Sequence, residues 1–90
     1  MDIRVQSTPN PNALKFILPE AQFDKPQSFP SAATAADHPL ARRIFALGRV
    51  YNVFMVRDFV TVNKLPDIPW EPLRDEIAAV LVAYFEKIEG

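Results

Sequence analysis

The sequence contains no cysteine, only two glycines and a single histidine. Without thiols the chain can form no disulfide, no thiolate-bound metal centre and no cysteine nucleophile. Gly48 and Gly90 stand too far apart to form a glycine-rich phosphate-binding loop. His38 precedes a proline at the predicted start of a helix, a position more typical of a cap than of a catalytic base. We therefore predict that the protein is not an enzyme and has no catalytic residues.

A long apolar run and a strong net charge are also missing. No segment approaches the roughly 20 apolar residues that cross a bilayer. The N-terminal sequence MDIRVQ lacks the apolar core of a signal peptide. The formal net charge of −1 gives no general attraction to nucleic acid or anionic lipid. The expectation is a soluble protein of the cytoplasm, or of an equivalent reducing compartment, with no nucleic-acid or membrane partner.

The sequence offers no complete set of metal ligands. Asp37 and His38 are adjacent, but two residues supply too few ligands for a metal site. We predict no metal site and no cofactor. Weak iron binding through Asp, Glu and His38 is an alternative that the sequence leaves open.

Apolar residues, in contrast, are plentiful. They make up 49% of the 90 residues and include seven phenylalanines, which is ample for a core and argues against disorder. A chain of this length has room for one core and not for two. The prediction is a single domain over residues 1–90.

Two alternating segments, residues 2–7 and 13–18, predict the first two strands. Apolar side chains fall at every second position and polar ones between them, as in a sheet that covers a core on one side only (Ile3 and Val5; Leu14, Phe16 and Leu18). Residues 19–37 contain three prolines and predict a long connection, which Phe23 and Phe29 attach to the core. Residues 28–32 are a candidate for a short edge strand within it.

A short helix is predicted after residue 38, capped by Asp37 or His38 and ended by Gly48 in the left-handed conformation. Residues 50–64 then predict a β-hairpin. A two-residue loop at Arg57 and Asp58 would pair Val53 with Val62 and Met55 with Val60, and would leave Phe54, Val56 and Phe59 partly exposed. A four-residue loop with another register stays open, because Arg-Asp is not a favoured turn pair.

A second helix is predicted from about Pro72 to the end of the chain. Its apolar stripe follows helical spacing and comprises Leu73, Ile77, Val80, Leu81, Tyr84 and Ile88, with Phe85 beside it. Trp70, just before this helix, could be an exposed anchor or could fold back onto the core. The element order β-β-(β)-α-β-β-α predicts an α+β fold, with two helices on one face of a mainly antiparallel, four-stranded sheet.

The sequence TPNPN at residues 8–12 predicts a rigid loop between the first two strands. Pro9 and Pro11 fix their own φ and restrict the preceding residues to extended conformations. Asn10 and Asn12 can hydrogen-bond to the nearby backbone. These residues leave open whether the loop is only a connector or also a recognition surface.

Four arginines carry an alternative interpretation of function. If Arg42, Arg43, Arg49 and Arg57 converged, they could bind a carboxylate or phosphate through bidentate contacts. The protein would then be a small anion- or phosphopeptide-binding domain.

Four segments in order resemble the N-terminal domain of Nfu, the NifU-like iron–sulfur cluster scaffold proteins. They are TPNPNALKF (residues 8–16), HPLARRIFALGRVYNVF (38–54), DFVTVNK (58–64) and WEPLRDEI (70–77). The departures are small: His38 replaces the usual serine, Arg49 interrupts a Gly-Val pair, and Asn63 stands where threonine is common.

The resemblance implies an accessory role in iron–sulfur cluster assembly or delivery. In full-length Nfu proteins a Cys-x-x-Cys motif in a separate C-terminal domain holds the cluster, and this sequence has no such motif. We therefore expect a stand-alone, non-catalytic interaction module whose partner is a cysteine-bearing iron–sulfur scaffold or client apo-protein. The residues expected to contact it are Asn10, Pro11, Asn12, Lys15, Phe54, Asp58 and Phe59.

Overall fold

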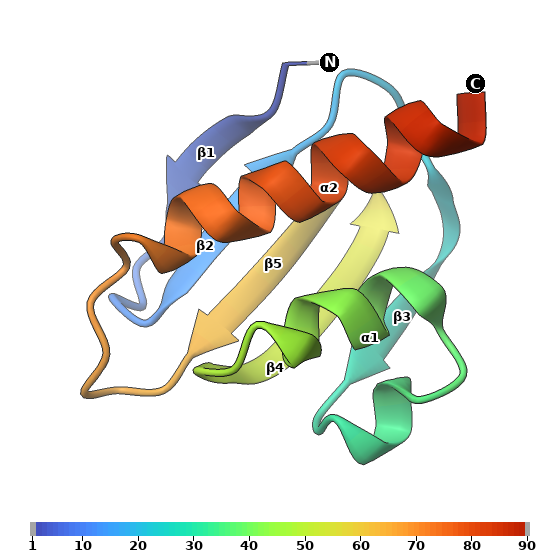
Figure 1. The fold of residues 1–90 in the computed structure, drawn as a ribbon. Coiled ribbons are helices and arrows are strands. Elements are labelled where there is room, and N and C mark those ends of the chain that lie inside the picture. The colour runs from blue at the N-terminus through green and yellow to red at the C-terminus, as the bar shows by residue number, and fades with distance from the viewer. Residues whose placement is uncertain (1, 90) are drawn as a thin grey trace.

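A computed structural model describes residues 2–89, and the side chains as far as residue 86. Five strands form one antiparallel sheet, and two helices cover one of its faces (Figure 1). The elements are β1 (Arg4–Ser7), β2 (Ala13–Ile17), β3 (Phe23–Phe29), a 3-10 turn η1 (Ala33–Ala35), α1 (Pro39–Ala46), β4 (Val50–Arg57), β5 (Phe59–Lys64) and α2 (Leu73–Glu89). The spatial order is β1-β2-β5-β4-β3, so that the β4–β5 hairpin lies between β2 and β3. The predicted α+β class and one-sided helices are confirmed.

The sheet has five strands rather than the four expected, because β3 occupies part of the predicted long connection. It pairs with β4 at the sheet edge, and its register with β4 shifts between Phe23 and Gln27. Pro26 lies within this irregular stretch, where an edge strand tolerates the missing N–H. The edge strand expected at residues 28–32 therefore begins earlier and ends at Phe29. Phe23 is buried and Phe29 packs on the core, as predicted.

The register of the second hairpin is the one predicted for a two-residue loop. Val53 pairs with Val62 and Met55 with Val60. Arg57 adopts a left-handed φ of 55°, an unusual conformation for a residue with a side chain. The carbonyl oxygens of Arg57 and Asp58 accept hydrogen bonds from the backbone N–H groups of Gln22 (2.8 Å) and Leu18 (2.6 Å). The connection between β2 and β3 thus stabilises this turn, although Arg57 and Asp58 are not residues that favour a two-residue turn.

The first helix begins and ends as its sequence predicts. His38 is the N-cap, and its Nδ1 accepts a hydrogen bond from the backbone N–H of Ala41 at 3.2 Å. Gly48 follows the helix with φ of 76°, the left-handed conformation in which glycine is least strained. Arg49 continues with φ of 64°, and the chain turns there into β4.

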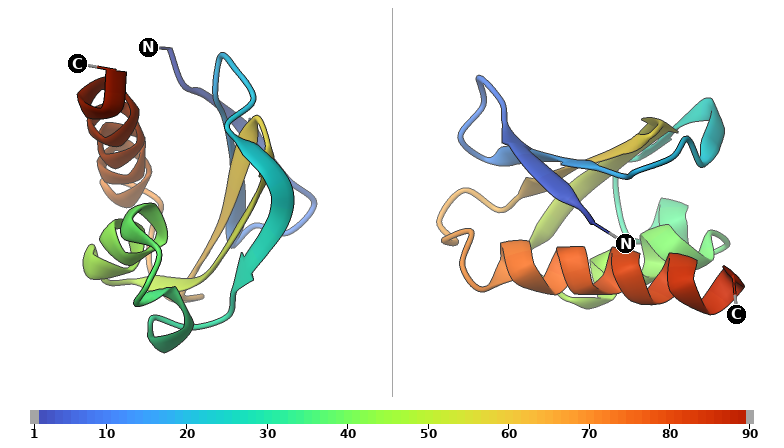
Figure 2. Two further views of the ribbon diagram at one scale, coloured as in Figure 1. Left: turned by 90° about the vertical axis from the view of Figure 1, so that its right-hand side faces the viewer. Right: turned by 90° about the horizontal axis from the view of Figure 1, so that it is seen from above.

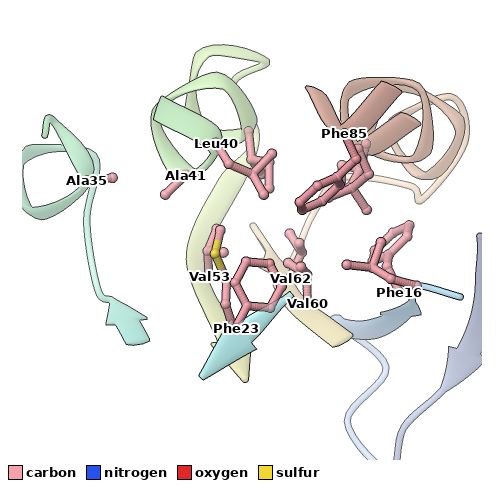
Figure 3. Packing of buried hydrophobic residues seen from close by; sticks show 14 of the residues in the cluster. Phe16, Phe23, Ala35, Leu40, Ala41, Val53, Val60, Val62 and Phe85 are labelled. Carbon is pink, nitrogen blue, oxygen red and sulfur yellow. The ribbon is translucent and has the colours of Figure 1, made fainter. Parts of the chain in front are cut away.

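The helices and the inner face of the sheet share one hydrophobic core. Figure 3 shows Phe16, Val53 and Val60 of the sheet beside Leu40 of α1 and Phe85 of α2. Of the predicted stripe on α2, Leu73, Ile77 and Leu81 are fully buried, Val80 and Tyr84 are partly buried, and the side chain of Ile88 lies outside the described residues. Within residues 2–89, no helix is both long and apolar enough to cross a membrane.

Candidate interaction surfaces

The TPNPN loop is held by its own side chains. The Thr8 hydroxyl lies within hydrogen-bond distance of the carbonyl oxygens of Asn10 (2.9 Å) and Ala13 (3.0 Å). The side-chain oxygen of Asn10 accepts a hydrogen bond from the backbone N–H of Asn12 at 2.9 Å. The predicted hydrogen bond between an asparagine side chain and nearby backbone is therefore present at Asn10. Thr8 adds hydrogen bonds to the loop that were not predicted.

Further contacts attach this loop to the rest of the molecule. The backbone N–H of Lys64 donates to the carbonyl of Asn12 (2.8 Å), and the amide of Asn10 donates to the side-chain oxygen of Asn63 (3.3 Å). The indole N–H of Trp70 donates to the carbonyl of Pro11 at 3.0 Å. Figure 1 shows the β1–β2 loop and the turn before α2 at the same end of the molecule. Trp70 is partly buried against the core, so the folded-back alternative is the one observed.

The outer face of the sheet has no helix over it (Figure 2). Phe59, the first residue of β5, lies on this face near the hairpin turn, with Ile17 of β2 and Val56 of β4 as its cross-strand neighbours. The ring of Phe54 lies 6.4 Å from that of Phe59, and the Lys15 ammonium lies 4.1 Å above the Phe59 ring centroid. All five side chains are only partly buried. We call these five residues the outer-face cluster.

Two members of this cluster, Ile17 and Val56, were not among the predicted contact residues. The signal for Ile17 was available, because alternation places it on the face opposite to Phe16. Its position beside Phe59, however, depends on the pairing of β2 with β5, which the sequence does not specify.

The seven predicted contact residues divide into three groups in the structure. Asn10, Pro11 and Asn12 lie beside the Lys64 end of β5. Asp58 lies in the turn before Phe59, at the other end of the strand. Six strand residues separate these ends by about 17 Å. Lys15, Phe54 and Phe59 belong to the outer-face cluster between them.

The four arginines are not brought together as a single anion site. Arg49 forms an ion pair with Glu76 of α2, and the guanidinium of Arg43 stacks 5.5 Å from the Tyr84 ring. Arg42 reaches the carbonyl of Ala36 at 3.5 Å. Arg49 directly precedes the eight-residue strand β4 and Arg57 ends it, so the length of the strand, about 23 Å, lies between them.

Acidic and histidine side chains do not gather into a metal site in the described part of the chain, where no three of them share one location. Burial lowers the pKa of His38 below its ordinary value of 6.5, and a backbone hydrogen bond opposes this shift. The low pKa keeps the ring neutral, which is the form whose Nδ1 can accept the capping hydrogen bond.

Comparison with known proteins gives consistent matches over nearly the whole chain. A family model described as the N-terminal part of the scaffold protein Nfu/NifU matches residues 3–88. The mitochondrial NifU-like protein 5 of Arabidopsis thaliana is 40% identical over 86 residues, which are 94% of this chain and 31% of that protein. The human mitochondrial NFU1 iron-sulfur cluster scaffold homolog is 39% identical over 87 residues, 94% of this chain and 34% of that protein. The chain thus spans about a third of the length of these relatives.

Solved structures show the same fold. A NifU-like protein from Saccharomyces cerevisiae superposes with a TM-score of 0.77 at 28% identity, covering 92% of this chain and 79% of that one. Protein SAV1430 from Staphylococcus aureus superposes with a TM-score of 0.76 at 26% identity, covering 90% of this chain and 99% of that one. The resemblance inferred from the sequence motifs is confirmed, and the chain belongs to the family of the Nfu/NifU scaffold N-terminal domain.

Proposed function

We propose that this chain is a non-catalytic protein-interaction module of iron–sulfur cluster biogenesis, which docks on a cysteine-bearing scaffold or client apo-protein. Membership of the Nfu/NifU N-terminal family supports the link to cluster biogenesis. The name of the human relative, an iron-sulfur cluster scaffold homolog, agrees with it. Iron–sulfur clusters are held by thiolates, and residues 1–90 contain no cysteine. The thiolates must therefore come from outside these residues.

The observation that carries the docking proposal is the outer-face cluster. Phe54, Phe59, Ile17 and Val56 keep apolar surface in contact with water on a face that no helix of the described residues covers. Aromatic side chains that are partly exposed and adjacent are typical of the central part of protein interfaces. Lys15 supplies a cation over the Phe59 ring, and the rigid TPNPN loop supplies a second contact at the end of the sheet.

An NMR titration tests this proposal. The ¹⁵N-labelled chain is titrated with the Cys-x-x-Cys domain of an Nfu protein, in the apo and the cluster-loaded forms. We expect saturable shifts of the amide signals of Lys15, Phe54 and Phe59, with smaller shifts in residues 10–12. Rigid-body docking should leave the amides of α1 unchanged.

A double variant, Phe54→Ser with Phe59→Ser, should weaken the binding by about tenfold or more, since apolar anchors carry most of an interface energy. The matched control is Val5→Ser, an exposed apolar residue on the edge strand β1. If neither form of the Cys-x-x-Cys domain shifts the outer-face amides, or if the double variant binds as tightly as the control, the docking proposal is wrong.

The proposed cellular location is a reducing compartment. A reducing compartment suits a partner that carries free thiols, and we predicted the cytoplasm. The two relatives named above are mitochondrial proteins. Fractionation of the source cells, with detection of this chain, distinguishes the compartments where the source has both.

A further inference from the structure

A small pocket lies beneath the TPNPN loop, at the end of the sheet. It has a volume of about 180 Å³ and is lined by Asn10, Asn12, Tyr51, Asn63, Lys64 and Pro66. Binding sites for whole small molecules usually measure about 300–1,000 Å³. A pocket of this size suits one functional group of a larger molecule rather than a complete cofactor.

Lys64 places a positive charge at this pocket. The residue is only 7% exposed, and its ammonium contacts the side-chain oxygen of Asn12 (3.0 Å) and the carbonyl of Leu65 (3.4 Å). The Trp70 ring centroid lies 5.7 Å from it. Among the described residues no carboxylate lies within ion-pair distance of this ammonium. A buried charge of this kind is usually paired.

The three asparagines of the pocket use their oxygens within the protein. The oxygen of Asn10 accepts from the Asn12 backbone, that of Asn12 accepts from Lys64, and that of Asn63 accepts from Asn10. The Asn63 amide in turn donates to Asn52 at 2.7 Å, which fixes its orientation. Since each carboxamide has two N–H donors, Asn12 keeps both of its donors and Asn10 and Asn63 keep one each, so that N–H donors remain available on all three side chains.

A positive charge, spare N–H donors and a lining that has no acidic residue in the described part of the chain all favour an oxyanion. We infer that this pocket binds a carboxylate side chain of an acidic peptide segment. Tyr51, which is 61% exposed at the rim, offers an apolar ring on which the rest of the peptide can pack. This inference deepens the proposed function and rests on it for the identity of the natural partner, which would present the acidic segment.

The test uses two blocked tripeptides, acetyl-Ala-Glu-Ala-amide and its matched glutamine form, and inorganic phosphate. NMR spectra of the ¹⁵N-labelled chain report the side-chain NH₂ signals of Asn10, Asn12 and Asn63. We expect saturable shifts with the glutamate peptide, with a dissociation constant on the order of millimolar. The glutamine peptide should shift the same signals far less.

The variant Asn12→Asp is the decisive one because it is isosteric. It places a carboxylate beside the Lys64 ammonium from within the protein, and should therefore weaken glutamate-peptide binding by about tenfold while the fold is kept. The matched control is Gln6→Glu, which makes the same charge change on an exposed position of β1 and should keep binding. Tyr51→Ser, at an exposed site, should weaken the binding of the glutamate peptide without unfolding the chain.

Three results would overturn the inference. They are equal shifts with the glutamate and glutamine peptides, unchanged binding in Asn12→Asp, and saturation by phosphate without any response to the glutamate peptide. The proposed function fails separately. If the scaffold shifts only the outer-face amides and the peptide does not bind, the pocket inference is wrong and the docking proposal stands. If the peptide binds and the scaffold causes no shifts, the docking proposal is wrong and the pocket inference stands.

Discussion

His38 makes the stability of the first helix depend on pH. Burial lowers the pKa of the folded-state ring, so the unfolded chain binds the proton more readily. The stabilisation from the neutral ring is therefore present above pH 6.5 and is lost as the pH falls through 6.5 toward the lower folded-state pKa. We expect the free energy of unfolding, measured by urea denaturation, to fall between about pH 7.5 and about pH 5.5.

The control for this prediction is His38→Ser. Serine can cap the helix by accepting the same hydrogen bond but does not titrate in this range. The variant should keep most of the stability at the higher pH and lose less of it at the lower pH. An equal loss in both proteins would assign the pH dependence to other groups.

Gly48 offers a second prediction at this scale. A Cβ built on Gly48 would have no atom within 4 Å, so a methyl group has room, yet φ is 76°. We expect Gly48→Ala to lower the free energy of unfolding by about 1 kcal/mol through backbone strain alone. Gly48→Asn should cost less, since asparagine tolerates the left-handed region. Equal values for the two variants in thermal or urea unfolding would contradict this explanation.

At the scale of elements, the TPNPN loop and the start of α2 stabilise each other through Trp70. Replacing Trp70 by phenylalanine removes the hydrogen bond to the Pro11 carbonyl but keeps an aromatic ring on the core. We expect a loss of about 1 kcal/mol in the free energy of unfolding. Hydrogen exchange at the backbone amides of Asn12 and Ala13 should become faster.

The control for Trp70→Phe is Tyr51→Phe, which also removes one polar group from an aromatic side chain but at an exposed position. It should change neither the stability nor the exchange rates. Unchanged exchange in Trp70→Phe would mean that the internal hydrogen bonds of the loop are sufficient to order it.

Periodicity in the sequence predicted both helices and both hairpins, because each of these elements buries one face of a locally continuous segment. It missed most of β3, because Pro26 and the polar residues of this strand interrupt the apolar alternation. The strand forms only through its pairing with the edge of β4. The two-residue turn of the second hairpin accepts hydrogen bonds from Leu18 and Gln22, which are remote from it in sequence, and periodicity could not reveal these contacts. The sequence identified these segments but not the contacts between them.

At the scale of the whole molecule, the sequence predicted two helices on one side of the sheet, and hence an uncovered face. It suggested Lys15, Phe54 and Phe59 as contact residues but could not show that β2 places Ile17 and Lys15 beside β5. The pocket was beyond prediction for the same reason. Asn12 and Lys64 are 52 positions apart in the chain, and only the pairing of β2 with β5 brings them together.

The strand order also bears on how the protein is made. β2 and β3 follow each other in the chain, but the later hairpin β4–β5 separates them in the sheet. A nascent chain that has emerged only as far as residue 48 therefore has neither the β4–β5 hairpin nor α2, which contribute eight of the fifteen buried residues in the described core. We expect a fragment of residues 1–48 to show the narrow amide dispersion of an unfolded chain, and folding during synthesis to wait until β5 has left the ribosome. A well-dispersed spectrum from that fragment would show that the first half folds alone.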